Sequence, residues 1–366
     1  MAPFVHSVPA RAGILGNPSD GYGGRTLAIT VDHFAATVTL TPSPGTITIL
    51  PSADDGWTWP SATEMAAHID RHGYGTGQQL LAAVVRTFFS VAESRDHDLP
   101  DGFTLSYETS IPRQVGLGGS SALVIATLRC LCDYTGLELP DPVLASIALS
   151  CETSQLGITA GLQDRVVQTY GGLVSMDFGR MKVDTQFGVQ YGDYARVDAG
   201  GLPPLFLAYR LDAAEPSGDY HRRLRERFES GDGFVRDTLR DLAVLVLEGR
   251  AALRWGDHEH FSQLVAKNMR LRRSLGPLPA HQEELVAIAD AEGAPATFAG
   301  SGGAVIGTYS DHDHFDRLVK AYASIDAPVV AVNRSSNNDH DQPKPSAGLS
   351  PPALAVVEPL RPRSTS

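Results

Sequence analysis

The chain has 366 residues, enough for two domains with full-sized cores at about 150 residues per domain. Its 42% hydrophobic and 20% charged residues are typical of an ordinary globular protein. The formal net charge of −12 argues against nucleic acid and anionic membranes as partners, because both need a clustered basic face. An anionic ligand is therefore expected to be held by a local pocket.

The sequence shows no membrane helix, signal peptide or metal-binding motif that we recognise. No apolar run reaches the roughly 18 residues of a membrane helix, and residues 1–11 lack the order of a signal peptide, so we expect a cytoplasmic protein. Cys130, Cys132 and Cys151 lie in apolar helical patterns and are interpreted as buried thiols rather than redox or metal groups. The 12 histidines show no metal-ligand spacing, so we assign no zinc site.

The first half of the chain predicts strands and then helices. A short apolar strand leads from Arg11 into a loop of turn-forming residues that ends at Asp20. Residues 27–31, 35–40 and 46–50 alternate apolar and β-branched residues and predict an antiparallel meander. Residues 54–60 predict a loop, whose Trp57 and Trp59 are more typical of packing than of base stacking. Further strands are predicted at 103–108, 173–178 and 187–191, and helices at 78–92, 120–134, 142–154 and 158–170.

A second α+β domain is predicted to open with a strand at 205–209. Long helical patterns cover 220–254, 258–275 and 281–292, and strands at 304–309 and 328–332 flank a helix at 314–324. From about residue 335 the composition changes to Ser, Asn, Asp and Pro, which predicts a disordered tail. The predicted domains are therefore 1–195 and 196–334, followed by the tail at 335–366.

A glycine-rich loop at 111–122 precedes the helix predicted from Ser120. Gly116, Gly118 and Gly119 let the backbone approach a ligand closely, and a helix N-terminus attracts phosphate. The loop lacks the Gly-Lys-Ser/Thr of a P-loop, and Ser121 stands where the Rossmann fingerprint has its third glycine. By itself such a loop favours phosphate binding no more than a structural turn with a helix cap.

Two carboxylates follow the loop. Asp164 opens or lies within a helix, where a lone aspartate is usually solvated or a cap. Glu152 lies on an apolar helix, where its charge needs solvent or a cation. With Ser120 or Ser121 they match a Mg·ATP site, which needs a hydroxyl, one or two carboxylates and a separate base. That division assigns the serine and Glu152 to the metal and Asp164 to the base.

Two further segments have both a structural and a functional interpretation. A second glycine cluster at 299–304 is either a simple connection between elements or a second wall around the nucleotide. The basic run at 221–227 is either a solvated helix face or a place to hold an acidic substrate.

These motifs, in this order, resemble those of the GHMP small-molecule kinases. The landmarks are the Arg-to-Asp substrate segment at 11–24, the Pro-x-x-x-Gly-Leu-Gly-x-Ser-x-Ala loop at 112–122 and the glycine motif at 293–304. The chain is most similar to the glucuronokinases, on Gly-Asn-Pro-Ser-Asp at 16–20, Ser-Ile-Pro-Arg-Gln-Val-Gly-Leu at 110–117 and the segment at 160–174.

The resemblance implies a two-domain α+β fold, with an N-terminal mixed α+β domain containing a left-handed β-α-β crossover and a ferredoxin-like C-terminal domain. It implies ATP and Mg²⁺, with Asp164 as the catalytic aspartate, Glu152 as the magnesium-binding glutamate and Arg11 near the transferred phosphoryl group. A gapless match makes Ser120 the other magnesium ligand and leaves Ser121 open. The residues expected at the nucleotide and its phosphates are Pro112, Gly116, Leu117, Gly118, Gly119, Ser120, Ser121 and Ala122. Those expected at the substrate are Asn17, Asp20, Tyr22, Arg113, Gly300, Ser301 and Gly302.

One departure from the family bears on the substrate. Galactokinase-like members have Glu-His facing the sugar's primary alcohol, where this chain has Asn17 and Pro18. A neutral amide removes a repulsion that would oppose a carboxylate on the sugar, which favours a uronic acid. The predicted reaction is phosphoryl transfer from ATP to the anomeric hydroxyl of D-glucuronate, a small sugar acid. Alternatives are galacturonate, a neutral sugar, a mevalonate-type acid, or a member that only binds a metabolite. Candidates to hold the substrate carboxylate are Arg25, Arg113, Arg165 and Arg225.

Overall fold

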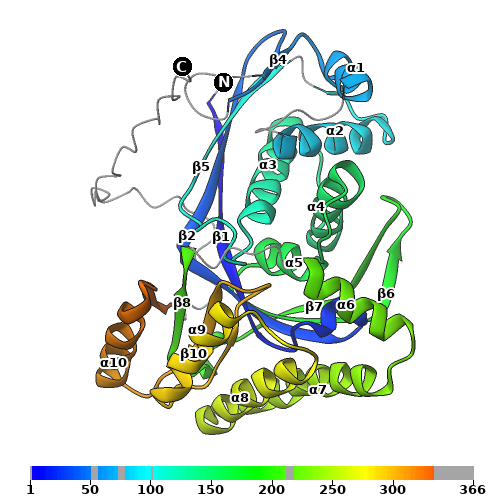
Figure 1. Ribbon diagram of the computed structural model, residues 1–366. Coiled ribbons are helices and arrows are strands. Elements are labelled where there is room, and N and C mark those ends of the chain that lie inside the picture. The colour runs from blue at the N-terminus through cyan, green and yellow to red at the C-terminus, as the bar shows by residue number, and fades with distance from the viewer. Residues whose placement is uncertain (1, 51–56, 73–78, 100–101, 212–217, 334–366) are drawn as a thin grey trace, which may run out of the picture. The chain divides into compact units, whose positions relative to one another are not determined.

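The computed structural model describes residues 2–50, 57–72, 79–99, 102–211 and 218–333. Within these residues the strands form two sheets, one of seven strands and one of four (Figure 1). The first sheet contains β1 (Phe4–Leu15), β2 (Arg25–Pro42), β3 (Ile47–Ile49), β4 (Trp57–Trp59), β5 (Phe103–Thr109), β6 (Leu173–Asp184) and β7 (Val189–Val197). The second contains β8 (Leu205–Tyr209), β9 (Ala296–Phe298), β10 (Ala304–Thr308) and β11 (Val329–Val332).

The long antiparallel pair of β1 and β2 is the axis of the first sheet. β5 and β6 pair with successive halves of β2, which is one continuous strand. The predicted meander is therefore wrong, because residues 27–31 and 35–40 belong to a single strand. The register with β1 shifts between Pro9, opposite Ala35, and Ala10, opposite Val31. Residues 32–34 of β2 form a bulge, and the polar Asp32 and His33 are typical of a turn in the sequence.

The outer strands of this sheet also differ from the prediction. β3 pairs in parallel with β5 rather than antiparallel with its predecessor in the chain. β4 is a short strand paired with β3, where a loop was expected; residues 54–56 of that loop lie outside the described residues. Trp59 is buried in the core, as the packing interpretation predicts.

Helices of the N-terminal part pack together on one side of this sheet (Figure 1). They are α1 (Ala62–His72), α2 (Gln79–Glu93), α3 (Gly119–Thr135), α4 (Asp141–Leu156) and α5 (Leu162–Tyr170). Amphipathic periodicity located α2, α3 and α4 well, and α3 lies directly against β1 and β2. The helix predicted at 158–170 begins only at Leu162, because Gly157 ends α4 in the left-handed conformation and Gly161 is extended.

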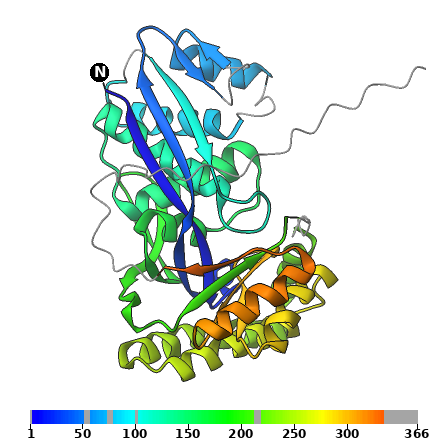
Figure 2. The same cartoon turned by 90° about the vertical axis from the view of Figure 1, so that its left-hand side faces the viewer.

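The second sheet has the strand order β11-β8-β10-β9 and is antiparallel. Its helices are α6 (Gly218–Glu229), α7 (Gly233–Trp255), α8 (His258–Ser274), α9 (Ala280–Ala291) and α10 (His312–Tyr322). The order strand, helices, two strands, helix, strand is the predicted ferredoxin-like arrangement. These helices gather in the lower part of Figure 2, around the lower end of the long β1–β2 pair.

The helical pattern at 220–254 is two helices, not one. Gly231 has φ 87° and Asp232 caps α7 by accepting a hydrogen bond from the Val235 N–H, so the chain turns between α6 and α7. The three-residue strand β9 was not predicted, because so short a run carries no readable periodicity.

The predicted domain boundary at 195/196 lies inside β7, two residues before Val197 ends that strand, and the chain changes sheets between Val197 and Leu205 at the start of β8. Residues 1–336 nevertheless form one compact unit, and the Gly13 N–H donates to the Ala299 carbonyl, linking β1 to the β9–β10 connection. The limits 1–195 and 196–334 therefore remain a prediction, and the tail lies outside the described residues.

The three cysteines are free thiols; Cys130 and Cys151 are buried and Cys132 is partly buried. Burial raises the pKa of each thiol to about 12. Among the helices that the structure describes, none is both long and apolar enough to span a membrane.

Candidate active site

The glycine-rich loop joins β5 to α3, as the sequence predicts. Gly116 has φ 77°, and Gly118, the N-cap residue of α3, has φ 74°. Both values lie in the left-handed region, which glycine adopts without strain. The loop therefore ends at the first turn of α3, whose N–H groups have no partner within the helix. Ser120 lies in this turn and is exposed. Leu117 and Ala122 are buried in the core, so only their backbone is available to a ligand.

The second glycine cluster packs directly against this loop. A Cβ on Gly116 would lie 2.9 Å from the Gly302 carbonyl oxygen and 3.0 Å from the Ser301 nitrogen. A Cβ on Gly300 would lie 2.2 Å from the Gly116 carbonyl oxygen. The two backbones touch because Gly116 and Gly300 have no Cβ at the contact, and the side chain of the exposed Ser301 lies beside it. The two glycine motifs that the sequence analysis singled out are neighbours in space.

Arg11 connects this junction to Asp164. Its Nη1 donates to the Gly116 carbonyl at 2.5 Å and to the Ala299 carbonyl at 3.0 Å, and its Nη2 donates to Asp164 Oδ2 at 2.6 Å. Burial alone would raise the pKa of the Asp164 carboxyl, but the positive charges of Arg11 and Arg165 outweigh it and hold that pKa below its ordinary value. Asp164 is therefore a carboxylate at neutral pH, and its side chain remains 24% exposed to receive a ligand.

Ser120, in the first turn of α3, contacts Glu152 of α4. Ser120 Oγ donates to Glu152 Oε1 at 2.8 Å, while Glu152 Oε2 pairs with Arg165 Nη2. Glu152 is 1% and Arg165 3% exposed, so the two form a buried ion pair. Arg165 therefore neutralises the negative charge of Glu152 on the apolar helix α4. A hydroxyl and a carboxylate oxygen side by side are donors that suit Mg²⁺, with phosphate and water completing its shell.

Ser121 faces the other way. It is fully buried, and its Oγ donates to Gln168 Oε1 at 2.6 Å. The Gln168 amide nitrogen in turn donates to the carbonyls of Pro9 and Gly118. Sequence reasoning missed Gln168, whose only signal is a polar residue on the buried side of α5. Of the two serines, Ser120 is the one beside a carboxylate.

The substrate segment forms a short 3-10 helix, η1 (Ser19–Tyr22), next to the start of α5. Asp20 lies close to Gly161, where a Cβ would be 3.3 Å from Asp20 Oδ2. Burial, and then the negative charge of Asp164, raise the pKa of the Asp20 carboxyl to about 6. Tyr22 stacks at a tilt on Phe228 of α6, with ring centroids 4.8 Å apart. The short helix η1 thus brings Asp20 under the influence of the Asp164 charge and Tyr22 against α6.

Other predicted site residues lie at varying depth. Asn17 is only 7% exposed and packs over Gly13, where a Cβ would lie 2.1 Å from its Nδ2. Pro112 is partly buried and Arg113 is exposed on the approach to the glycine loop.

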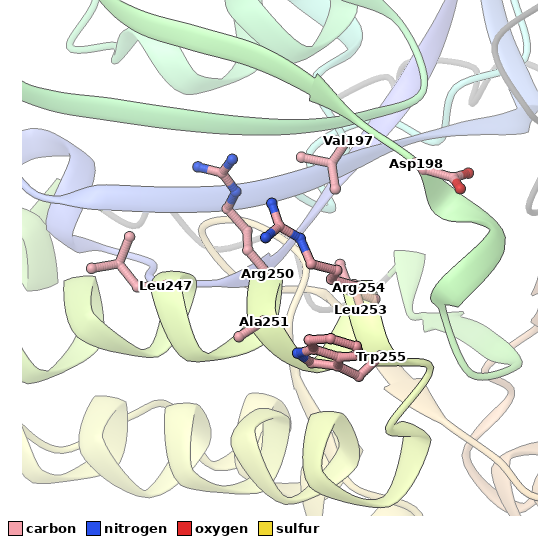
Figure 3. A pocket seen from close by; sticks show the side chains of 8 residues that line it. All are labelled: Val197, Asp198, Leu247, Arg250, Ala251, Leu253, Arg254 and Trp255. Atoms are coloured by element: carbon pink, nitrogen blue, oxygen red, sulfur yellow. The ribbon is translucent and has the colours of Figure 1, made fainter.

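A separate pocket of about 510 Å³ lies along α7 (Figure 3). Arg250 and Arg254 point from α7 toward the strands above it, and the exposed Trp255 lies at the C-terminal end of α7. None of the residues expected at ATP or the sugar lines it, so it is not the site described above. The full lining is Val197, Asp198, Leu247, Arg250, Ala251, Leu253, Arg254 and Trp255.

Comparison with known proteins places this geometry in a family. The model described as "GHMP kinases N terminal domain" matches residues 79–172, and "GHMP kinases C terminal" matches residues 250–325. Glucuronokinase 1 of Arabidopsis thaliana is 39% identical over 311 residues, covering 83% of this chain and 84% of the relative. The chain belongs to the GHMP kinases. Probable glucuronokinase 2 of the same plant is 40% identical over 310 residues, with 83% of each chain covered.

The fold of this GHMP kinase is also that of solved members of the family. The mevalonate kinase of Methanococcus jannaschii superposes with a TM-score of 0.71 at 17% identity, covering 90% of this chain and 98% of that one. The N-terminal match contains the glycine loop, Glu152 and Asp164, whereas Arg11 and Asp20 precede it. The two-domain α+β GHMP kinase fold expected from the sequence is thereby confirmed.

Proposed function

We propose that this GHMP kinase transfers the γ-phosphoryl group of ATP to the anomeric hydroxyl of D-glucuronate and so forms glucuronate 1-phosphate. The observation that carries the proposal is the Arg11–Asp164 pair, which holds an ionised, partly exposed carboxylate beside the junction of two glycine segments. The two Arabidopsis thaliana relatives named as glucuronokinases support the choice of acceptor. ATP as the donor points to the cytoplasm as the compartment.

Asp164 has the role of positioning the acceptor and taking its proton. Its carboxylate accepts a hydrogen bond from the anomeric hydroxyl and aligns that oxygen with the γ-phosphorus. Since the pKa of Asp164 is low, the proton moves late, as the new O–P bond forms and the bond from phosphorus to the ADP oxygen breaks. Arg11 keeps the carboxylate in place and offsets negative charge on the phosphates.

The nucleotide phosphates are assigned to the glycine loop and the N-terminus of α3, where backbone N–H groups are available. Ser120 and Glu152 are assigned to Mg²⁺, because the exposed Ser120 hydroxyl at the start of α3 and the buried Glu152 carboxylate on α4 are adjacent oxygen donors. When bound, Mg²⁺ offsets charge on the phosphates between which the bond breaks. Ser121 is not assigned to the metal, since its hydroxyl is used inside the protein.

A carboxylate on the sugar is supported by the neutral Asn17 in the substrate segment. A glutamate there would add to the charges of Asp20 and Asp164 and would oppose an acidic substrate. Galacturonate, a neutral hexose and a mevalonate-type acid are the competing acceptors.

The test is phosphoryl transfer by the purified chain with ATP and Mg²⁺ to D-glucuronate, D-galacturonate, D-glucose, D-galactose and mevalonate. ADP release measures turnover, and ³¹P NMR of the product gives the position of the phosphate. We expect the highest kcat/KM with D-glucuronate and a phosphate on C1. Preference for a neutral hexose, a phosphate elsewhere, or binding without turnover would each overturn the proposal.

A further inference from the structure

The proposed substrate brings a negative charge into a site that already contains two carboxylates. Asp20 and Asp164 lie close enough for the charge of Asp164 to raise the pKa of Asp20. An anionic sugar therefore needs a cation of its own, and Arg11 is already paired with Asp164. The question is which other arginine can reach the sugar.

Two of the four arginines proposed from the sequence are committed elsewhere. Arg25 Nε donates to Asp177 Oδ2 at 2.7 Å, on the strand pair of β2 and β6. Arg165 is 3% exposed and forms the buried pair with Glu152. Releasing it would leave Glu152 as an uncompensated buried charge. Neither guanidinium is available to a substrate.

Two arginines of the basic run on α6 are also paired with carboxylates. Arg222 pairs with Glu226 on the same helix at 3.4 Å, and Arg227 pairs with Asp232 at 2.8 Å. These two contacts stabilise α6 and its connection to α7. They follow the solvated-helix interpretation of the run.

Arg225 differs from these neighbours because it is directed at the substrate segment. Its Cζ lies 5.4 Å from the centroid of the Tyr22 ring, and its Nη2 would be 3.8 Å from a Cβ on Gly21. Within the described part of the chain no carboxylate is paired with Arg225, which is exposed. Stacking on an aromatic face leaves the N–H donors in the guanidinium plane free for a bidentate contact with a carboxylate.

The order of groups along the site matches the order of groups along the sugar. Asp164 is followed by Asp20, then by Gly21 and the Arg225 guanidinium. In a pyranose uronic acid the anomeric carbon and the carboxylate lie on opposite sides of the ring oxygen. A sugar whose anomeric hydroxyl meets Asp164 and whose ring lies along Asp20 would therefore direct its carboxylate toward α6.

We infer that Arg225 binds the substrate carboxylate and makes this enzyme selective for a sugar acid over the neutral sugar. The inference rests on the proposed function, because it takes the acceptor to be a uronic acid. The Arg225 guanidinium stacks on the Tyr22 ring, and the Tyr22 ring packs in turn against Phe228. Arg225 is thus a specificity residue that α6 contributes to a site otherwise built from the N-terminal strands, the glycine segments and α5.

The test compares D-glucuronate with D-glucose, which has an alcohol in place of the carboxylate. For Arg225→Gln we expect the KM for glucuronate to rise about 10- to 100-fold, the effect of losing a hydrogen bond to a charged group. The kcat should change little, because the contact is the same in the ground and transition states. Titration calorimetry in the presence of MgADP gives the Kd of each sugar without requiring turnover, and the Kd of glucose should stay the same. Arg225→Lys should fall between, since it keeps the charge and loses the fork.

Arg236→Gln is the matched control. Arg236, on α7, lies over the Phe228 ring at the same 5.4 Å and donates to the Phe228 carbonyl. Its substitution removes a comparable contact and should leave the binding of both sugars unchanged. Equal weakening of glucuronate and glucose by Arg225→Gln, or no weakening, would overturn the inference, as would the expected selectivity change appearing in Arg113→Gln instead. A wild-type enzyme that does not phosphorylate glucuronate would instead refute the proposed function.

Discussion

Asp20 carries a charge that costs the folded protein stability, so we expect Asp20→Asn to be more stable than the wild type. Its pKa is raised from 3.8 to about 6 by burial and by Asp164. At 1.36 kcal/mol per unit, this difference corresponds to ~3 kcal/mol of unfolding free energy. Because the folded-state pKa is the higher one, the cost is absent below about pH 4, grows between about pH 4 and pH 6, and is complete above that. Asparagine removes the charge and keeps an oxygen that accepts hydrogen bonds.

Urea unfolding followed by tryptophan fluorescence at pH 5, 6, 7 and 8 tests this expectation. The free energy of unfolding of Asp20→Asn should exceed that of the wild type by up to ~3 kcal/mol at pH 8 and by less at pH 5. Asp237→Asn, which removes an exposed carboxylate from α7, should change it by less than about 0.5 kcal/mol at every pH. The kcat/KM for the sugar should fall in Asp20→Asn, since we assign this carboxylate to the binding of the sugar ring. A variant that is no more stable than the wild type at pH 8, or equally stabilised at pH 5 and 8, would refute the electrostatic reasoning.

Three further outcomes are expected. Asp164→Asn should lower kcat by about 10²- to 10⁴-fold while keeping the affinity for ATP, as measured by ADP release and calorimetry; unchanged turnover would contradict its role. Ser120→Ala should raise the Mg²⁺ concentration needed for half-maximal rate, whereas Ser121→Ala should leave that concentration unchanged and lower the free energy of unfolding by about 1–3 kcal/mol; the reverse pattern would reassign the metal ligand. Gly300→Ala should lower the melting temperature and kcat together, because its methyl group would lie 2.2 Å from the Gly116 oxygen; normal activity and stability would show that the two glycine segments are not in contact in solution.

The parts of the site that could be predicted from the sequence are local ones. The glycines of the loop, the start of α3 and the serines after it lie within a dozen residues, and the conformations that they need are properties of those residues. The pairing of Arg11 with Asp164 joins residues 153 positions apart, so only the resemblance to a family could suggest it. The gapless match to the family favoured Ser120 as the metal ligand but left Ser121 open. Packing distinguishes the two, by turning one hydroxyl toward Glu152 and the other inward.

In the fold, too, local features could be predicted from the sequence and contacts between distant segments could not. Periodicity located α2, α3 and α4, because their apolar positions recur along each segment, but it did not predict α1. It could not reveal that β2 continues through its bulge or that β3 lies parallel to β5, because both depend on which strand lies beside them. The break between α6 and α7 was readable in Ser-Gly-Asp at 230–232, but the helical pattern on either side concealed it.

The carbonyls that hold Arg11 have a consequence for how the enzyme is made. One of them belongs to Ala299, 288 residues after Arg11 in the chain. During synthesis the N-terminal part leaves the ribosome long before that carbonyl exists, and contacts of such sequence separation form late in folding. A nascent or truncated chain can therefore complete the glycine loop and its helix while Arg11, to which we assign a role at the transferred phosphoryl group, is still without one of its two backbone acceptors. Phosphoryl transfer would then begin only once the β9–β10 connection has joined the first sheet.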